Sequence, residues 1–96
     1  MDHVYLVAYD IRDPRRWRKV FRAMKGYGDS IQYSVFRCVL SPEQSVQMVS
    51  ALGEAMNQKE DRILIADLGP VGGRGEHSIT GLGEKLPDIV KGAIIL

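Results

Sequence analysis

The residue of this chain that is best placed for chemistry is Asp10, a carboxylate that directly follows an almost wholly apolar run, residues 4–9. The run is short and rich in β-branched and aromatic residues, which predicts a central strand buried on both faces. Asp10 then stands at the carboxyl end of that strand, where ligands gather in open α/β layers. The alternative is that Asp10 only forms the turn after the strand.

A cluster of basic residues follows Asp10 and has the side chains that bind phosphate. The helix predicted over residues 14–25 contains six cationic residues and no acid, so no i,i+4 ion pair relieves their repulsion. Binding to nucleic-acid phosphates would explain the cluster, and an ordinary solvated charged face is the alternative. The candidate nucleic-acid-binding residues are Arg12, Arg15, Arg16, Arg18, Lys19 and Arg22.

The basic residues are positioned by a helix whose start and end the sequence marks. Asp13 is a suitable N-cap and Pro14 suits the first helical position, while Gly26 marks the end. One face carries an apolar stripe with helical spacing, so the basic residues fall on the other side. The stripe consists of Trp17, Val20, Phe21 and Met24.

Residues 28–40 are apolar and rich in strand-forming residues, but their alternation slips at Val35 and Phe36. Two antiparallel strands with a bend near Tyr33 and Ser34 explain this slip better than one long strand. Ser41 and Gln44 then form a capping-box pattern, which predicts a helix over residues 42–57. We expect its inward face to carry Val46, Val49, Leu52 and Met56.

The last third of the chain contains one further strong strand, residues 62–68, bounded by the charged residues 59–61 and by Gly69 and Pro70. The glycine-rich residues 72–75 lack the Lys-Ser/Thr and the following helix of a phosphate loop, so they predict a flexible turn. Residues 77–82 fit an edge strand. The apolar end, residues 93–96, needs a surface on which to be buried, and a partner subunit would provide it.

Composition limits the classes of protein that fit this sequence. Lys and Arg number 13 against 12 Asp and Glu, so the overall charge is balanced and only the crowding of basic residues near the amino terminus is informative. Cys38 is the single cysteine, which excludes an intrachain disulfide and a multi-cysteine metal site and fits a reducing, cytoplasmic location. No signal peptide or membrane-spanning run is present, so we expect no membrane partner.

The predicted order of strand, helix, two strands, helix and strand is that of an α+β, ferredoxin-like βαββαβ sandwich. We expect one domain over residues 1–96, with a core over about 1–68. Residues 69–96 then form the glycine-rich turn and an extra C-terminal strand or tail that docks on a partner subunit. A chain of 96 residues buries a modest core, which a homodimer would enlarge.

Three motifs resemble the small CRISPR-associated adaptation protein of the Cas-two family. They are Tyr9-Asp10-Ile11 with Asp13 and Arg16, then residues 26–28, and then residues 32–36. The resemblance implies a homodimer in which the Asp10 carboxylates of the two protomers meet and hold a divalent ion, Mg²⁺ or Mn²⁺. Two carboxylates repel unless they share a proton or a cation, and Mg²⁺ neutralises them while keeping several waters.

The resemblance also implies a role in CRISPR adaptation, in which the protein acts with the Cas-one integrase to acquire new spacers, and we keep two hypotheses for that role. In the first, the protein is a metal-dependent endonuclease on single-stranded RNA or duplex DNA, with Asp10 as the catalytic metal ligand. No other acid forms part of the site in this hypothesis, because the remaining acids look peripheral. In the second, the protein is a non-catalytic architectural subunit that joins Cas-one integrase dimers and holds a prespacer duplex. A more distant alternative is a small-molecule-sensing ferredoxin-like module.

Overall fold

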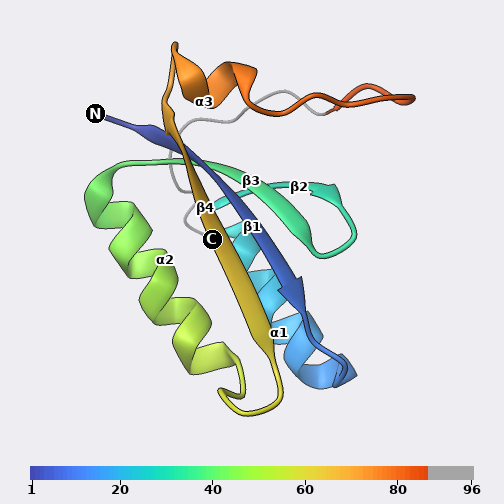
Figure 1. The fold of residues 1–96 in the computed structure, drawn as a ribbon. Helices are drawn as coiled ribbons and strands as arrows, with labels where there is room; N and C mark the ends of the chain where they lie inside the picture. Colours follow the sequence, from blue (N-terminus) through green and yellow to red (C-terminus); the bar gives the residue numbers. More distant parts are fainter. Residues whose placement is uncertain (87–96) are drawn as a thin grey trace.

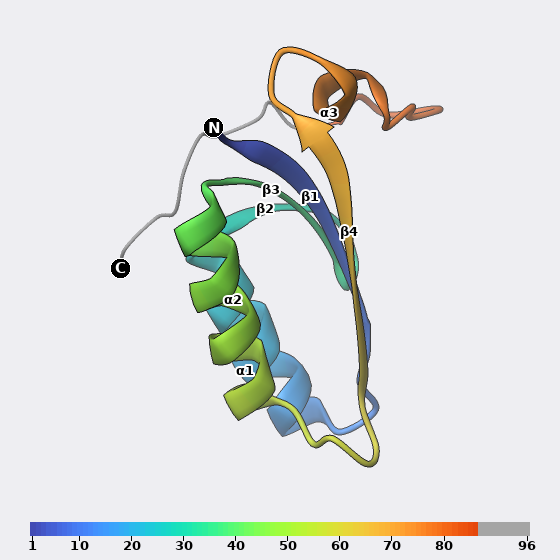
Figure 2. The ribbon, with the colours of Figure 1, turned by 60° about the vertical axis from the view of Figure 1, so that its left-hand side comes forward.

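The computed structural model describes residues 1–86, which contain a four-stranded antiparallel sheet and three helices (Figure 1). The strand order is β2-β3-β1-β4, and α1 and α2 both cover the same face of the sheet (Figure 2). This arrangement confirms the predicted ferredoxin-like α+β fold. The elements are β1 (His3–Asp10), α1 (Pro14–Lys25), β2 (Gly28–Gln32), β3 (Val35–Leu40), α2 (Pro42–Ala55), β4 (Arg62–Pro70) and α3 (Arg74–His77).

Strand β1 is central, as predicted, and pairs antiparallel with β3 on one side and β4 on the other. Val7 and Tyr9 point toward the helices and belong to the main core cluster. Successive side chains alternate between faces, so Leu6 and Ala8 lie on the opposite face, where both are only partly buried. The expected burial of β1 on both faces is therefore incomplete, because no helix among residues 1–86 covers that second face around Leu6 and Ala8.

Helix α1 begins and ends where the sequence predicted. The Asp13 carboxylate accepts a hydrogen bond from the Arg16 backbone N–H at 2.9 Å, and Pro14 opens the helix. Val20 and Met24 are fully buried, and Trp17 packs against the core from the edge of the helix. The other side of α1 is left free for charge.

Helix α2 has the predicted capping box but uses a different inward face. Met48 and Leu52 are buried, whereas Val46 is 69% exposed and Val49 is 52% exposed. The assignment of Val46 and Val49 to the core was therefore wrong. The stripe with Val46 and Val49 and the stripe with Met48 and Leu52 both have helical spacing, so periodicity could not decide between them. Packing of α2 beside α1 and β3 selects the stripe that contains Met48.

The segment after β4 also differs from the prediction. Residues 74–77 form the short helix α3, and residues 78–82 form no strand, so the expected edge strand over 77–82 was wrong. Gly75 explains how closely α3 approaches the sheet, because a Cβ at this position would lie 2.5 Å from the Gly69 carbonyl oxygen and 2.8 Å from Val4 Cγ2. Because glycine has no Cβ, α3 can pack on the end of the sheet. The expected C-terminal strand over 93–96 lies outside the described residues.

None of the helices in residues 1–86 is long and apolar enough to cross a membrane.

Candidate functional site

Asp10 is the last residue of β1 and its side chain is exposed. The register of β1 and β4 sets Asp10 opposite Arg62, so the two side chains leave the same face of the sheet. Among residues 1–86, the Asp10 carboxylate has no hydrogen-bond or ion-pair partner. It is therefore available to an external ligand.

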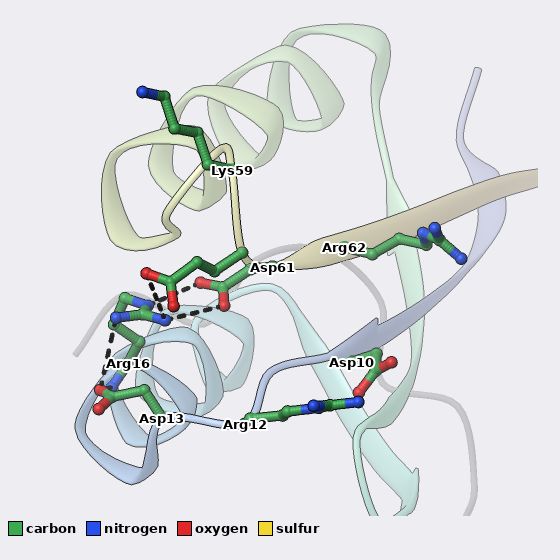
Figure 3. A pocket seen from close by; sticks show the side chains of 8 residues that line it. Asp10, Arg12, Asp13, Arg16, Lys59, Asp61 and Arg62 are labelled. Atoms are coloured by element: carbon green, nitrogen blue, oxygen red, sulfur yellow. Dashed lines mark hydrogen bonds and ion pairs between the residues drawn. The ribbon is translucent and has the colours of Figure 1, made fainter.

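A pocket of about 650 Å³ opens beside Asp10 (Figure 3). Four acidic and four basic residues line it, from the end of β1, the start of α1 and the loop that enters β4. In Figure 3 the Arg12 side chain points toward Asp10, whereas the Arg16 side chain points away from it toward Asp61. The lining residues are Asp10, Arg12, Asp13, Arg16, Lys59, Glu60, Asp61 and Arg62.

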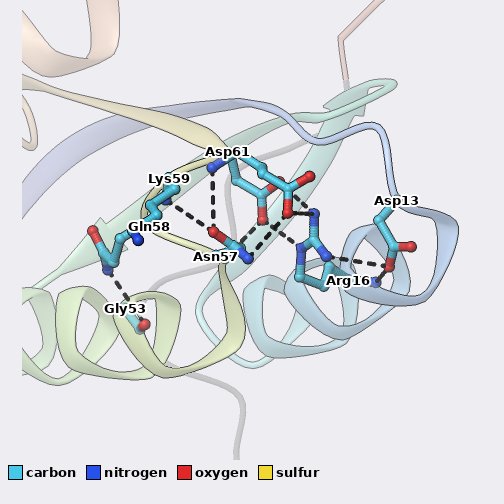
Figure 4. Close-up of polar contacts among 8 residues, drawn as sticks. Asp13, Arg16, Gly53, Asn57, Gln58, Lys59 and Asp61 are labelled. Atoms are coloured by element: carbon cyan, nitrogen blue, oxygen red, sulfur yellow. Dashed lines mark hydrogen bonds and ion pairs between the residues drawn. The ribbon is translucent and has the colours of Figure 1, made fainter.

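Arg16 forms a bidentate ion pair with Asp61 at the inner wall of this pocket (Figure 4). Arg16 Nε donates to Asp61 Oδ2 at 2.8 Å, and Arg16 Nη2 donates to Asp61 Oδ1 at 3.1 Å. The Asp61 side chain is only 1% exposed, and the Arg16 side chain is 26% exposed. This geometry fixes the start of α1 to the loop before β4, so Arg16 has a structural task that its place in the basic cluster did not reveal.

The loop before β4 is itself ordered by Asn57. The Asn57 side-chain oxygen accepts hydrogen bonds from the backbone N–H groups of Lys59 at 2.9 Å and Glu60 at 3.2 Å. The Asn57 backbone N–H in turn donates to Asp61 Oδ2 at 2.8 Å. These local hydrogen bonds hold Asp61 in position to pair with Arg16, and they order the chain just before Arg62, the first residue of β4.

Electrostatics agree with this geometry. The hydrogen bonds from the Arg16 guanidinium hold the pKa of Asp61 below its usual range and raise the pKa of Arg16, so the pair stays ionised. Burial, with a smaller contribution from Tyr33, raises the pKa of Tyr9 to about 12. Tyr9 is thus a neutral phenol at physiological pH, and it is unsuited to act as a general base beside Asp10.

The basic residues predicted from the sequence divide into two groups. Five are exposed and form no ion pair within residues 1–86, so they remain available to phosphate: Arg12, Arg15, Arg18, Lys19 and Arg22. Arg16 is the exception because Asp61 holds it. Its predicted contact with nucleic acid stays a prediction.

Sequence reasoning missed four residues of the pocket: Lys59, Glu60, Asp61 and Arg62. Asp61 looked peripheral in a charged boundary, yet it is the buried partner of Arg16; the Asn57 turn four residues earlier was the available signal. Lys59 and Arg62 were treated as ordinary flanks of a strand, and only the pairing of β4 with β1 brings Arg62 to Asp10.

The site is compatible with a divalent cation but does not enclose one by itself. Within residues 1–86, no three His, Cys, Asp or Glu side chains gather closely enough to form a metal cluster. A single exposed carboxylate is nevertheless a suitable donor for Mg²⁺, which is often held by one or two carboxylates, substrate phosphates and waters. Asp10 fits that description, and a second copy of the chain would supply a second carboxylate.

The fold and the pocket define a class: a small ferredoxin-like protein with an exposed carboxylate, flanked by arginines, at the end of its first strand. The model of the family described as "CRISPR associated protein Cas2" matches residues 3–70. The chain therefore belongs to the Cas2 family, as the three sequence motifs had indicated.

Two relatives and one solved structure illustrate the similarity. A "CRISPR-associated endoribonuclease Cas2" from Geobacter sulfurreducens is 40% identical over 96 residues and covers both chains completely. A "CRISPR-associated endoribonuclease Cas2 1" from Rhodospirillum rubrum is 49% identical over 69 residues, which are 72% of this chain and 68% of the relative. The crystal structure of Streptococcus pyogenes Cas2 at pH 6.5 superposes with a TM-score of 0.71 and 29% identity, covering 83% of this chain and 99% of that one.

Proposed function

We propose that this protein is a metal-dependent endonuclease of the CRISPR system, acting on RNA or DNA as a homodimer in the cytoplasm. The observation that carries the proposal is the exposed Asp10 carboxylate, which has no partner among residues 1–86 and is set among arginines in an open pocket at the end of the central strand. The relatives named as endoribonucleases support a nuclease activity in general. The bound Mg²⁺ or Mn²⁺ would supply an activated water and charge stabilisation at the phosphoryl oxygen.

The chain's own residues bind and orient the substrate in this proposal. Asp10 would hold the cation, and Arg12 and Arg62, which line the same pocket, would bind the phosphates on either side of the cut. The Arg16–Asp61 pair acts indirectly, because it fixes the two segments that carry Arg12 and Arg62. Arg16 is thus a positioning residue here.

The open face of the sheet supports the proposed homodimer. Leu64, the partner of Ala8 in the register of β1 and β4, is 62% exposed, and Leu6 and Ala8 are only partly buried. Asp10 points from this same face. Two copies packed through it would bury the apolar residues and bring the two Asp10 carboxylates toward one another, as the family resemblance implies.

A second candidate function is the architectural subunit that joins Cas-one integrase dimers and holds a prespacer duplex. The acid-free basic face of α1 favours it, because such a surface binds a phosphate backbone without any chemistry. The acids beside Asp10 point in the same direction, because Asp13 caps α1 and Asp61 is paired with Arg16. The more distant alternative, a metabolite sensor, gains no support from the family or from a pocket that is open and highly charged.

Metal removal tests the proposed activity. We expect the purified protein to cut labelled single-stranded RNA or duplex DNA in Mg²⁺ or Mn²⁺ and to stop when EDTA is added, with recovery when excess Mg²⁺ is restored. The measurement is the rate of product formation on a denaturing gel across a metal titration. Cutting that persists in EDTA after metal removal would contradict the proposal.

Charge reversal tests the basic face of α1. We expect the triple variant Arg15→Glu, Arg18→Glu and Arg22→Glu to weaken duplex binding at moderate salt, and to reduce the slope of log K against log salt by about 3. The matched control reverses two exposed cations outside α1, Arg74→Glu and Lys85→Glu. Fluorescence anisotropy across a salt series measures both, and equal losses in the two variants would remove α1 from the binding surface.

A further inference from the structure

Three aromatic rings form a stacked column from α1 to the turn between β2 and β3. The rings of Trp17 and Phe21 lie 5.0 Å apart between centroids at an interplanar angle of 16°. The rings of Trp17 and Tyr33 lie 4.7 Å apart at 14°. Tyr33 is 79% exposed, so the column ends in a flat aromatic face open to solvent.

The turn that carries Tyr33 is held in one conformation. Ser34 has a φ of 63°, in the left-handed region that residues other than glycine rarely adopt. The Trp17 indole N–H donates to Ser34 Oγ at 2.7 Å, and the Tyr9 backbone N–H donates to the Ser34 carbonyl oxygen at 3.0 Å. Because these bonds and the stacking on Trp17 already order Tyr33, little freedom is lost when a ligand covers it.

A shallow hollow of about 210 Å³ lies between Tyr33 and Asp10. Its walls come from the end of β1, the β2–β3 turn and the start of β4, all of which lie beside one another in Figure 1. The lining is mainly apolar, with Val35 and Leu64, but Asp10 and Arg62 stand at its charged side. Ala8 and Leu64 in this hollow belong to the sheet face that the proposed homodimer buries. A base would therefore cover the exposed ring of Tyr33 at the rim of the hollow, with the phosphate of the same nucleotide toward Arg62.

We propose that Tyr33 is a stacking platform for one unpaired nucleobase next to the phosphodiester bound at Asp10. This inference rests on the proposed function and narrows its substrate to single-stranded nucleic acid, because a base within a duplex is already stacked on its neighbours and is not free to cover Tyr33. Stacking on an aromatic ring tolerates any base, so the platform orders the strand without reading its sequence. Tyr33 belongs to the sequence motif of residues 32–36, but that motif gave it no binding role.

The test measures base-dependent binding without cleavage. Anisotropy in EDTA gives the dissociation constants of a fluorescein-labelled 12-nucleotide RNA and of a ribose-phosphate strand of equal length that lacks bases. We expect the wild-type protein to prefer the strand with bases by about tenfold or more. Tyr33→Leu, which keeps an apolar side chain over Trp17 but removes the flat ring, loses this preference, and Tyr33→Phe retains it.

The outcomes separate this inference from the proposed function. If Tyr33→Leu keeps the preference for the strand with bases, or if wild-type protein shows no such preference while binding both strands, the platform is overturned and the function stands. If wild-type protein binds neither strand, the platform is overturned, and cleavage of RNA and duplex DNA in Mg²⁺ tests the proposed function separately. Circular dichroism melting of the variants confirms that the fold is intact, which we expect because Tyr33 is largely exposed.

Discussion

Replacing Asp61 with asparagine lowers the free energy of unfolding by about 2 kcal/mol, since the change leaves the Arg16 guanidinium without its buried counter-charge. The carboxylate accepts two hydrogen bonds from Arg16 and one from the Asn57 backbone, and a neutral amide has one acceptor oxygen for these three donors. In a domain of this size the melting temperature falls by about 10 °C. Thermal unfolding followed by circular dichroism measures the shift.

The neighbouring acid provides a matched control. Glu60 is also close to Arg16, at 3.9 Å, but its side chain is 67% exposed, so Glu60→Gln removes the same charge with an effect of about 0.5 kcal/mol or less. Equal destabilisation by the two variants would show that overall charge, rather than the buried pair, is responsible.

The stability difference between wild type and Asp61→Asn also depends on pH in a defined direction. The Arg16 hydrogen bonds hold the pKa of Asp61 below its usual range in the folded protein. The contribution is therefore complete above the unfolded pKa of about 4 and is lost as pH falls through the lower folded pKa. Denaturant unfolding at several pH values is expected to give a constant difference from pH 8 to 5 and a narrowing one below pH 4. A stability difference that narrows already near pH 6 would contradict its assignment to the Asp61 carboxylate.

The fold could be predicted from local signals where those signals were chemically specific. The Asp13 and Ser41 caps, the bend at Ser34 and the apolar run before Asp10 each depend on a few neighbouring residues, and each is confirmed. The inward face of α2 failed because two apolar stripes compete and only contact with the rest of the core decides between them. The prediction of a flexible turn over residues 72–75 missed the start of α3 for a related reason. The close packing of Gly75 on β4 is a long-range contact, which local sequence does not reveal.

The site was predicted in part for the same physical reason. Asp10 was found because its exposure follows from a local pattern, a polar residue at the end of a buried strand. Arg62 and Asp61 were missed because they are about 50 residues distant in sequence from Asp10 and come close only through the pairing of β4 with β1. The column that ends at Tyr33 joins a helix to a turn and has no sequence periodicity of its own.

Substitution of Asp10 by asparagine has the largest expected effect on function. The variant keeps the size of the side chain and removes the negative charge that we propose to hold the cation, so the cleavage rate falls by about 100-fold or more. Binding of the strand in EDTA is retained or becomes slightly tighter, because a carboxylate that repels phosphate is gone. Single-turnover cleavage of labelled RNA and of duplex DNA, with anisotropy for binding, measures the two effects separately.

Glu54→Gln is the control for Asp10→Asn, because it removes one exposed carboxylate of α2 that does not line the pocket, with the same change of net charge. We expect it to cut and bind as wild type does. If wild type and Asp10→Asn are both inert but bind duplex equally, the architectural function replaces the enzymatic one, since that role needs the basic face of α1 and not Asp10. If both cut equally, Asp10 is not the metal ligand, because loss of its charge would then leave the reaction unchanged.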